Sequence, residues 1–269
     1  MKVIDLNADV GEADNADWAQ SEADILRFVS SANIACGGHA GDKETMRLTL
    51  QNAKQNNVSV GAHPAYPDRK NFGRKSLTLG KDISQADLKQ SLTNQITTLM
   101  EVAAEEGVTI AYVKPHGALY NDAVKDAIKA ELIASVIHAL NPSLIFMGGP
   151  NSEMAQAAKA YGLEFIAEGF IDRRYTDDGH LLNRRRQGAV LATDESRIDQ
   201  AVSLAVEGSV KTQSGKTLHI HPQSLCLHGD SAGAVETARK TKAALEQANI
   251  SIQSFALPQF SKNLKQGSP

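Results

Sequence analysis

Short apolar runs alternate with longer segments of helical periodicity along most of the chain. Alternating strands and helices favour a parallel sheet with helices on its faces. Seven or eight such units in about 250 residues fit a (β/α) barrel, and a doubly wound open sheet is the alternative. The runs that predict strands cover residues 3–6, 32–36, 58–62, 109–113, 143–147, 164–170 and 224–227, with 250–255 as a candidate last strand.

Two of the predicted helices carry recognisable capping residues. Asp42 is placed to cap the start of one helix. Ser84, followed three residues later by Asp87, resembles a capping box at the start of a second helix, which Gly107 ends. Further helices are predicted over residues 131–140, 152–161, 196–206 and 232–248.

The chain contains no linker rich in Pro, Ser or Gly, so residues 1–256 are predicted to form a single barrel domain. Residues 172–223 are too many for a simple crossover and are expected to leave the barrel as an excursion. This excursion includes a helix and a predicted hairpin with strands 209–212 and 217–220. Residues 257–269 are predicted to form a polar C-terminal tail.

Polar and ionisable residues gather where the apolar runs end. In a parallel barrel the C-terminal ends of the strands share one face, on which active sites are built. Four of the eight histidines lie at such ends, each beside Gly or Pro. The sequence therefore predicts a functional pocket at this face. Its candidate residues are Asp5, Asn7, Asp9, Glu12, His39, His63, Lys114, His116, Asp172, Arg173, Arg174, His228 and Asp230.

These residue types support acid–base and electrostatic chemistry. Histidine exchanges protons near neutral pH, and lysine stabilises a developing oxyanion or a phosphate. Lys114 and His116 are two positions apart, so their side chains are expected to leave the strand end on the same face. The structural alternative is that Lys114 pairs with Asp5 or Asp9 and holds the barrel together.

A metal site is a second interpretation of the same residues. Asp9, His39 and His63 would supply two imidazoles and a carboxylate from three strand ends. The spacing does not decide the question, because the chain has neither H-E-x-x-H nor a paired C-x-x-C. A divalent metal ion therefore stays an open candidate.

Composition narrows the function classes. The chain carries 28 Lys and Arg against 31 Asp and Glu, and this net charge of -3 argues against a general binder of nucleic acid or membrane surfaces. Hydrophobic residues at 42% and charged residues at 22% exclude a disordered chain. Cys36 and Cys226 are the two cysteines, too few for a secreted disulfide framework. No apolar run approaches the roughly 20 residues of a membrane span, so we expect a cytoplasmic protein.

The tetrad Ser214-Gly215-Lys216-Thr217 is similar to the end of a phosphate-binding loop. That loop requires Gly five residues before Gly215, where this chain has Val210, and it requires a helix rather than a hairpin after it. No G-x-G-x-x-G follows a predicted strand either. If ATP is used, the chain lacks both common phosphate-binding loops.

Longer segments surround the polar residues at the strand ends. They are Asp5-Leu-Asn-Ala-Asp-Val-Gly-Glu12, Ala32-Asn-Ile-Ala-Cys-Gly-Gly-His-Ala-Gly-Asp42, Gly61-Ala-His-Pro-Ala-Tyr-Pro-Asp68, Phe72-Gly-Arg74, Lys114-Pro-His-Gly-Ala-Leu-Tyr-Asn121, Asp172-Arg-Arg-Tyr175 and Cys226-Leu-His-Gly-Asp230. Together these segments resemble the LamB/YcsF family, in the same order along residues 3–256. The two visible departures are Gly38, where the family usually has an aromatic residue, and Ile171, where it usually has Ala.

The resemblance implies an α/β fold, a distorted seven-stranded TIM-like (β/α) barrel similar to deacetylases and glycoside hydrolases, in which residues 250–255 are peripheral. It also implies ATP-dependent cleavage of 5-oxo-L-proline (pyroglutamate) to L-glutamate, with ATP hydrolysed to ADP and phosphate. The chain would be the A subunit of a multi-subunit 5-oxoprolinase with B and C subunits as partners. ATP would be a co-substrate, bound by or shared with one of these partners.

The roles of single residues come from the strand-end interpretation, restricted to the matching segments. Two alternative functions stay open. One is a stand-alone metal-dependent deacetylase or amidohydrolase, suggested by the Asp and His set. The other is a non-catalytic carbohydrate-binding barrel, for which an aromatic content of 5% is low. The expected catalytic residues are Lys114, His116, Asp9 and His63, and the expected substrate-binding residues are Asn7, Glu12, His39, Asp172, Arg173, His228 and Asp230.

Overall fold

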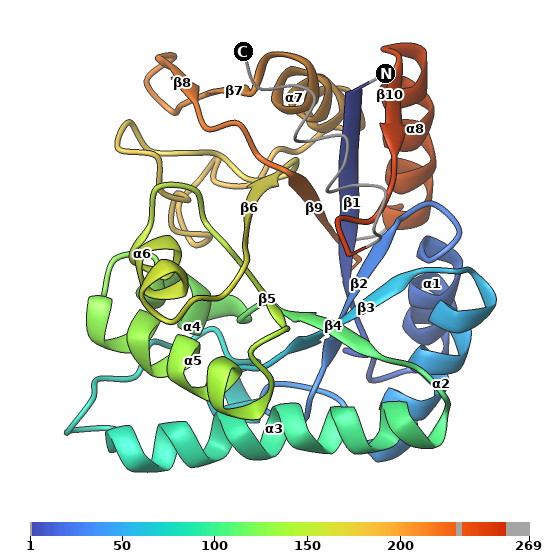
Figure 1. Cartoon of the computed structure of the whole chain (residues 1–269). Helices are drawn as coiled ribbons and strands as arrows, with labels where there is room; N and C mark the ends of the chain where they lie inside the picture. The colour runs from blue at the N-terminus through green and yellow to red at the C-terminus, as the bar shows by residue number, and fades with distance from the viewer. Residues whose placement is uncertain (1, 230–232, 257–269) are drawn as a thin grey trace.

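The chain folds into a closed parallel β-barrel surrounded by helices (Figure 1). The computed structural model describes residues 2–229 and 233–256. The strand order is β1, β2, β3, β4, β5, β6 and β9, and the pairing of β1 with β9 closes the ring. The seven-stranded barrel is confirmed, and the open-sheet alternative is wrong. The strands are Lys2–Val10, Ser31–Ala35, Ser59–His63, Ile110–Val113, Ile145–Gly148, Phe165–Phe170 and Ser224–His228.

The last strand lies outside this ring. β10 (Ile250–Ile252) pairs in parallel with residues 2–4 of β1, whereas residues 5–9 of β1 pair with β9. One long strand therefore changes partner along its length. The expected peripheral position of residues 250–255 is confirmed for the strand, while Phe255 packs against Tyr112 with ring centroids 5.0 Å apart.

Helices cover the outside of the barrel, and at least one follows each barrel strand. The two predicted caps are present: Asp42 Oδ1 accepts from the amide of Thr45 at 2.8 Å, and Ser84 Oγ accepts from the amide of Asp87 at 3.0 Å. None of the described helices is long and apolar enough to cross a membrane. The helices are α1 Ala16–Ile25, α2 Lys43–Gln55, α3 Gln85–Glu105, α4 Gly117–Ala123, α5 Ala127–Leu140, α6 Glu153–Ala160, α7 Asp194–Glu207 and α8 Ala234–Gln247, with the short 3₁₀ helix Arg69–Asn71 after β3.

Helix α4 was not among the predicted elements. It has only seven residues, and its N-cap His116 makes no side-chain capping bond. Such a short helix without a capping side chain carries too few periodic positions to be recognised from sequence. It begins directly after the Lys114-Pro115-His116 segment and so places His116 at the barrel mouth.

The connection between β6 and β9 contains α7 and a small antiparallel hairpin, formed by β7 (Ser209–Lys211) and β8 (Thr217–His219). Gly215 lies in the turn of this hairpin. The context of a phosphate-binding loop is therefore absent at this tetrad. The predicted tail, residues 257–269, lies outside the described residues.

The barrel interior is polar over much of its length. Along β1, the apolar residues join the core between strands and helices, while the residues between them bond to side chains of other strands. This follows from the period of two in a strand, which sends successive side chains to opposite faces. The buried apolar side chains therefore lie mainly between the barrel strands and the surrounding helices. The outward set is Ile4, Leu6, Ala8 and Val10, and the inward set is Asp5, Asn7 and Asp9.

A separate apolar cluster closes the N-terminal end of the barrel. It consists of Tyr112, Ile145, Met147, Ile166 and Phe255. The Tyr112 hydroxyl donates to Asn33 Oδ1 at 2.7 Å, which fixes the ring across the interior. A Cβ on Gly61 would lie 2.2 Å from Cε2 of that ring. Glycine at position 61 therefore makes room for the tyrosine.

We expect Gly61→Ala to lower the free energy of unfolding by about 1–3 kcal/mol, the typical cost of overpacking a core. The ring of Tyr112 is held by Asn33 and Phe255, so it cannot move aside without breaking those contacts. Urea unfolding measures the loss. In a Tyr112→Leu background the same substitution is expected to cost less, because the clashing ring atoms are gone. Equal losses in both backgrounds would show that the ring is not the constraint.

Candidate active site

A buried ammonium group lies at the centre of the barrel. Lys114 follows β4, and its side chain is 2% exposed. Its Nζ is 2.9 Å from Asp9 Oδ1 and 2.8 Å from Glu168 Oε1. It also donates to Cys226 Sγ at 3.1 Å and to Asn7 Oδ1 at 3.2 Å. Lys114 therefore pairs with Asp9, as the structural alternative expected, and with a second carboxylate besides.

The charges of this group stabilise one another. Burial alone would lower the pKa of Lys114, but Asp9, Cys226 and Glu168 more than compensate and raise it well above its ordinary value. Burial alone would raise the pKa of Asp9, but His63 and Lys114 outweigh it and lower that pKa well below its ordinary value. Lys114 and Asp9 are therefore both ionised at neutral pH.

Sequence reasoning missed Glu168. It lies in β6, within a run that was correctly predicted as a strand, and it is fully buried. A single acidic residue inside an otherwise apolar strand was the available signal, because such a charge is rarely buried without a partner. Its Oε2 has no hydrogen-bond partner among the described residues, so one buried acceptor stays open to a donor.

Asn7 belongs to the same interior network. Its Nδ2 donates to Glu168 Oε1 at 3.1 Å and to Ser224 Oγ at 2.7 Å. Its Oδ1 accepts from Asn33 Nδ2 at 2.7 Å and from Lys114. Both polar atoms are engaged within the barrel, so the expected substrate contact of Asn7 stays a prediction.

Asp5 lies deeper in the barrel and is enclosed by hydroxyl groups. Its Oδ1 accepts from Ser30 Oγ at 2.7 Å and Ser31 Oγ at 2.6 Å, and its Oδ2 accepts from Ser224 Oγ. Burial raises the pKa of Asp5 from 3.8 to about 6, although these hydrogen bonds oppose the shift. Asp5 thus links β1 to the start of β2 and to β9, away from the histidines.

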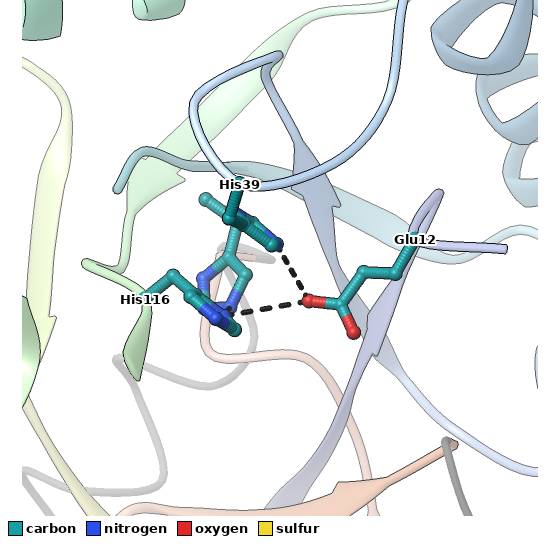
Figure 2. A group of neighbouring side chains, drawn as sticks. Glu12, His39 and His116 are labelled. Atoms are coloured by element: carbon teal, nitrogen blue, oxygen red, sulfur yellow. Dashed lines mark hydrogen bonds and ion pairs between the residues drawn. The ribbon is translucent and has the colours of Figure 1, made fainter. Parts of the chain in front are cut away.

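Three histidines, His39, His63 and His116, lie around the carboxylate of Glu12. Figure 2 shows two of them, His39 and His116, directed toward that carboxylate. Glu12 Oε1 is 2.7 Å from His39 Nε2 and 3.4 Å from His116 Nδ1. His116 Nδ1 is 3.0 Å from His63 Nε2, and the rings of His39 and His116 stack with centroids 3.6 Å apart. The structure therefore brings together four predicted residues from the ends of β1, β2, β3 and β4. Asp9 joins them, because its Oδ2 is 3.4 Å from His63 Nε2.

Burial favours the neutral forms of His39, His116 and Glu12. Burial and the neighbouring His63 hold the pKa of His39 well below its ordinary value, and burial and His39 do the same to the pKa of His116. Burial also raises the pKa of Glu12. Proton donors and acceptors with displaced pKa values thus lie within bonding distance of each other, an arrangement typical of sites that transfer protons.

The loop after β3 holds His116 in place. Phe72 and Gly73 are consecutive residues with φ of 54° and 61°. The left-handed region is unusual for a bulky residue such as Phe and carries strain. In this conformation the Phe72 carbonyl accepts from His116 Nε2 at 3.0 Å, and a Cβ on Gly73 would lie 2.9 Å from the Cβ of His39. The strained turn therefore fits closely over the histidine pair.

A second carboxylate–histidine pair lies beside Asp9. His228 Nδ1 is 2.7 Å from Asp172 Oδ2, and His228 Nε2 is 3.9 Å from Asp9 Oδ2. Burial alone would lower the pKa of His228, but Asp172 outweighs it and raises that pKa. The side chain of His228 is 14% exposed, more than those of the other histidines of the site. A partly exposed ring with a raised pKa suits an anionic group of a substrate.

The two arginines among the candidate residues bond to backbone carbonyls. Arg173 is buried, and its Nη2 donates to the carbonyl of Leu182 at 2.7 Å. Its Nε has no hydrogen-bond partner among the described residues. Arg174 Nε donates to the carbonyl of Gly188 at 3.2 Å. The expected substrate contact of Arg173 stays a prediction, and Asp230 lies outside the described residues.

Both cysteines are buried free thiols. Burial raises the pKa of Cys36 to about 12 and raises that of Cys226 well above its ordinary value. The thiolate is the nucleophilic form of cysteine. The structure therefore gives neither cysteine the environment of a nucleophile.

Gly38, one of the two positions that depart from the resembling motifs, makes room for Gln95. A Cβ at Gly38 would lie 2.3 Å from Gln95 Oε1. The Gln95 amide bonds to both backbone groups of Ala65, accepting from the amide at 2.9 Å and donating to the carbonyl at 2.9 Å. Glycine at position 38 thus allows Gln95 of helix α3 to hydrogen-bond the loop that follows His63.

The chain is similar to known proteins over nearly its whole length. The model of the LamB/YcsF family matches residues 4–259. A 5-oxoprolinase A subunit of Agrobacterium fabrum is 43% identical over 257 residues, which are 95% of this chain and 99% of that protein. The crystal structure of the lactam utilization protein from Thermus thermophilus is 35% identical with a TM-score of 0.85, covering 95% of this chain and 100% of that one. The peptidoglycan deacetylase PdaC from Bacillus subtilis, 12% identical, shares the fold with a TM-score of 0.50 over 98% of this chain and 92% of that one.

We expect Asp5→Asn to change the pH dependence of stability. The folded pKa of Asp5, about 6, lies above the unfolded value of 3.8, so the unfolded chain loses its proton first as the pH rises. The stability contributed by the protonated carboxyl is therefore complete below about pH 4 and falls by about 3 kcal/mol up to pH 7. The asparagine has no such loss, so the variant is expected to gain stability relative to the parent between pH 4 and pH 7.

Urea unfolding of parent and variant at several pH values measures this difference. Asp14→Asn, at an exposed position, is the matched control, because an exposed carboxylate is hydrated in both states. A difference between Asp5→Asn and parent that stays constant with pH would contradict the expected titration.

Proposed function

The chain belongs to the LamB/YcsF family, and we propose that it is the A subunit of an ATP-dependent 5-oxoprolinase, which cleaves 5-oxo-L-proline to L-glutamate and hydrolyses ATP to ADP and phosphate. The observation that carries the proposal is the 43% identity to a 5-oxoprolinase A subunit over almost the full length of both proteins. The buried acid–base groups at the C-terminal ends of the strands support it, because lactam hydrolysis requires proton transfer.

The chemistry explains why ATP is needed. A five-membered lactam is an unstrained amide, so attack by water requires activation. Transfer of the γ-phosphoryl group from ATP to the amide oxygen would release ADP and make the ring carbon a better electrophile. Water then attacks the ring carbon, the ring C–N bond breaks and the nitrogen takes up a proton, which leaves an acyl phosphate. A second water hydrolyses the acyl phosphate to the carboxylate of glutamate and inorganic phosphate. A base for water, an acid for nitrogen and a positive group near the oxygen are therefore the required elements.

We assign proton transfer to His63 and His116. Asp9 lies beside them and is oriented by Lys114. Asp9 Oδ1 is held by Lys114 at 2.9 Å, so its Oδ2 points toward His63 Nε2 at 3.4 Å. Because the ammonium of Lys114 is paired with two carboxylates, we propose that it acts through Asp9 rather than on the substrate. His228, whose pKa the neighbouring Asp172 raises, is the proposed contact for the substrate carboxylate or a phosphate.

ATP is proposed to bind on a partner protein of the assembly or at a site shared with one. The chain has neither common phosphate-binding loop, and the one similar tetrad lies in the β7–β8 hairpin. The related proteins are named as A subunits, which implies an assembly of several different chains. B and C subunits are the partners that we propose, and the reaction is proposed to take place in the cytoplasm.

We expect the isolated chain to release little or no glutamate from 5-oxoproline and ATP. Together with the B and C subunits it is expected to release glutamate in step with ADP, because the partners complete the ATP site. Enzymatic assays of glutamate and ADP measure both. Robust turnover by the isolated chain with ATP would contradict the partner requirement. Release of product without ATP would favour the deacetylase or amidohydrolase alternative, and no turnover with the partners present would contradict the proposed function.

We expect His116→Asn to lower the turnover of the assembled enzyme by about 10²–10⁴-fold, the usual loss when a general acid or base is removed. Asparagine preserves much of the size and some hydrogen bonding but cannot exchange a proton. His138→Asn is the matched control, because His138 is exposed on helix α5. A folded His116→Asn protein that binds its partners and keeps turnover within a few-fold of the parent would remove His116 from the mechanism.

A further inference from the structure

The cluster of Glu12, His39, His63 and His116 brings acceptor atoms close to one another. Its three histidines and one glutamate are all buried, and each offers a ligand atom within 4.8 Å of the others. They come from four different strand ends, so the barrel as a whole determines their positions. Hydrogen bonds at the far side of the His63 and His116 rings identify which nitrogen of each carries the proton.

Two of the rings have their tautomers determined by backbone carbonyls. His63 Nδ1 is 2.8 Å from the carbonyl oxygen of Lys114, and His116 Nε2 is 3.0 Å from the carbonyl oxygen of Phe72. A carbonyl oxygen accepts hydrogen bonds and never donates, so both of these nitrogens carry hydrogen. In the neutral rings the remaining nitrogens, His63 Nε2 and His116 Nδ1, then present lone pairs.

These two lone pairs face each other. His63 Nε2 and His116 Nδ1 are 3.0 Å apart, and Glu12 Oε1 is 3.4 Å from His116 Nδ1. Acceptor atoms at this separation repel unless a cation lies between them, and that cation is either a proton or a metal ion. Ligands that bind zinc tetrahedrally at about 2.0–2.1 Å lie about 3.3–3.4 Å from one another, close to the separations found here.

The outer hydrogen bonds match those of metal-binding histidines. Such histidines usually donate their second ring N–H to a backbone carbonyl or a carboxylate, which orients the ring. Both His63 and His116 do so. The left-handed turn at Phe72 and Gly73 supplies one of these carbonyls, which gives its strain a function.

His39 supports the carboxylate instead of adding a third imidazole ligand. Its Nδ1 has no hydrogen-bond partner among the described residues, so a proton there would be a buried donor without an acceptor. The proton therefore belongs on Nε2, which donates to Glu12 Oε1 at 2.7 Å. Carboxylates that bind metal ions are commonly held by hydrogen bonds of this kind.

A neighbouring group is less suited to a cation. Asp9, Cys226 and His228 also offer ligand atoms within 4.8 Å of one another. There the ammonium of Lys114 already supplies positive charge, 2.9 Å from Asp9 Oδ1 and 3.1 Å from Cys226 Sγ. The set of Asp9, His39 and His63 considered from the sequence likewise includes a carboxylate oxygen that is already paired.

We propose that His63 Nε2, His116 Nδ1 and the carboxylate of Glu12 bind a late first-row divalent metal ion such as Zn²⁺. Two imidazoles and one carboxylate favour this class over Mg²⁺ or Ca²⁺, which prefer oxygen ligands. Three protein ligands leave a fourth position open, as in catalytic zinc sites. An ion there supplies Lewis-acid chemistry, polarising a carbonyl or lowering the pKa of water. The proposal does not rest on the oxoprolinase function, because binding is measured without substrate.

The test uses the full chain, treated with a chelator and dialysed. We expect calorimetry to show one equivalent of Zn²⁺ bound, and Co²⁺ to give the visible absorption of a four-coordinate site that Zn²⁺ abolishes. His63→Gln and His116→Gln are expected to weaken Zn²⁺ binding by more than about 100-fold, and His39→Gln by about 10–100-fold, the usual loss for an outer hydrogen-bond partner. His138→Gln, on the outside of the barrel, is expected to bind like the parent.

Several results would overturn the proposal. A parent protein that binds neither Zn²⁺ nor Co²⁺ would do so, and ¹⁵N spectra showing a shared proton on His63 and His116 would then identify the cation between the rings. Folded His63→Gln and His116→Gln proteins that bind Zn²⁺ like the parent would also do so. If these variants do not fold, the Co²⁺ spectrum of the parent still shows whether a four-coordinate metal site is present.

A metal ion on His63 Nε2 and His116 Nδ1 would replace the proton-transfer role proposed for these two residues above, because a metal-bound nitrogen has no lone pair for a proton. The same variants separate the two roles of His116. If His116 only carries a proton, its substitution reduces turnover while Zn²⁺ titrations of the parent stay flat. If it is a ligand, substitution reduces both turnover and binding. A parent protein that binds Zn²⁺ but releases no glutamate from 5-oxoproline in the presence of its partners would contradict the proposed function. It would leave the proposed metal site unaffected.

Discussion

The ion pairs of Lys114 with Asp9 and Glu168 are the interaction on which the barrel interior depends. A single charge in such surroundings would cost several kcal/mol, because burial removes its hydration. The three charges offset this cost for one another, and they join β1, β4 and β6 across the barrel. The pairing also sets the orientation of Asp9, since one oxygen is bound to Lys114 and the other faces His63. Removing Lys114 would leave two buried carboxylates without their partner and would release Asp9, the carboxylate that lies next to the histidines.

A polar interior limits where the fold obtains its stability. Most apolar burial lies between the strands and the helices, and the interior contributes a small apolar cluster at the N-terminal end. Above that cluster, carboxylates, amides and hydroxyls satisfy one another in a buried network, which is stabilising only when nearly every member has a partner. Asp5, with its raised pKa, shows the strain of this arrangement. Proteins commonly accept such local costs at functional sites and offset them elsewhere in the fold.

Backbone groups, rather than side chains, orient the two central histidines. The carbonyls of Lys114 and Phe72 determine which nitrogen of His63 and His116 carries hydrogen, and the turn that positions the second carbonyl is strained. Substituting the side chain of Lys114 or Phe72 leaves its backbone carbonyl in place. Only a change in the loop geometry would therefore alter which ring nitrogen carries hydrogen. Gly73 matters for that reason, because a side chain there would press on His39 and His116.

The sequence by itself determined the features that depend on neighbouring residues. The alternation of apolar runs and helical segments predicted the barrel, the caps at Asp42 and Ser84 were recognisable, and the turn at Gly215 excluded a phosphate-binding loop. The polar residues at strand ends predicted which side chains would meet. Tertiary structure alone decided how they meet. It makes Glu168 the second partner of Lys114 and engages both polar atoms of Asn7 in hydrogen bonds inside the barrel. It also brings the lone pairs of two histidines face to face. Asp9 and Lys114 are 105 positions apart in the chain. Contacts of that kind depend on the register of a closed barrel, which local periodicity does not encode.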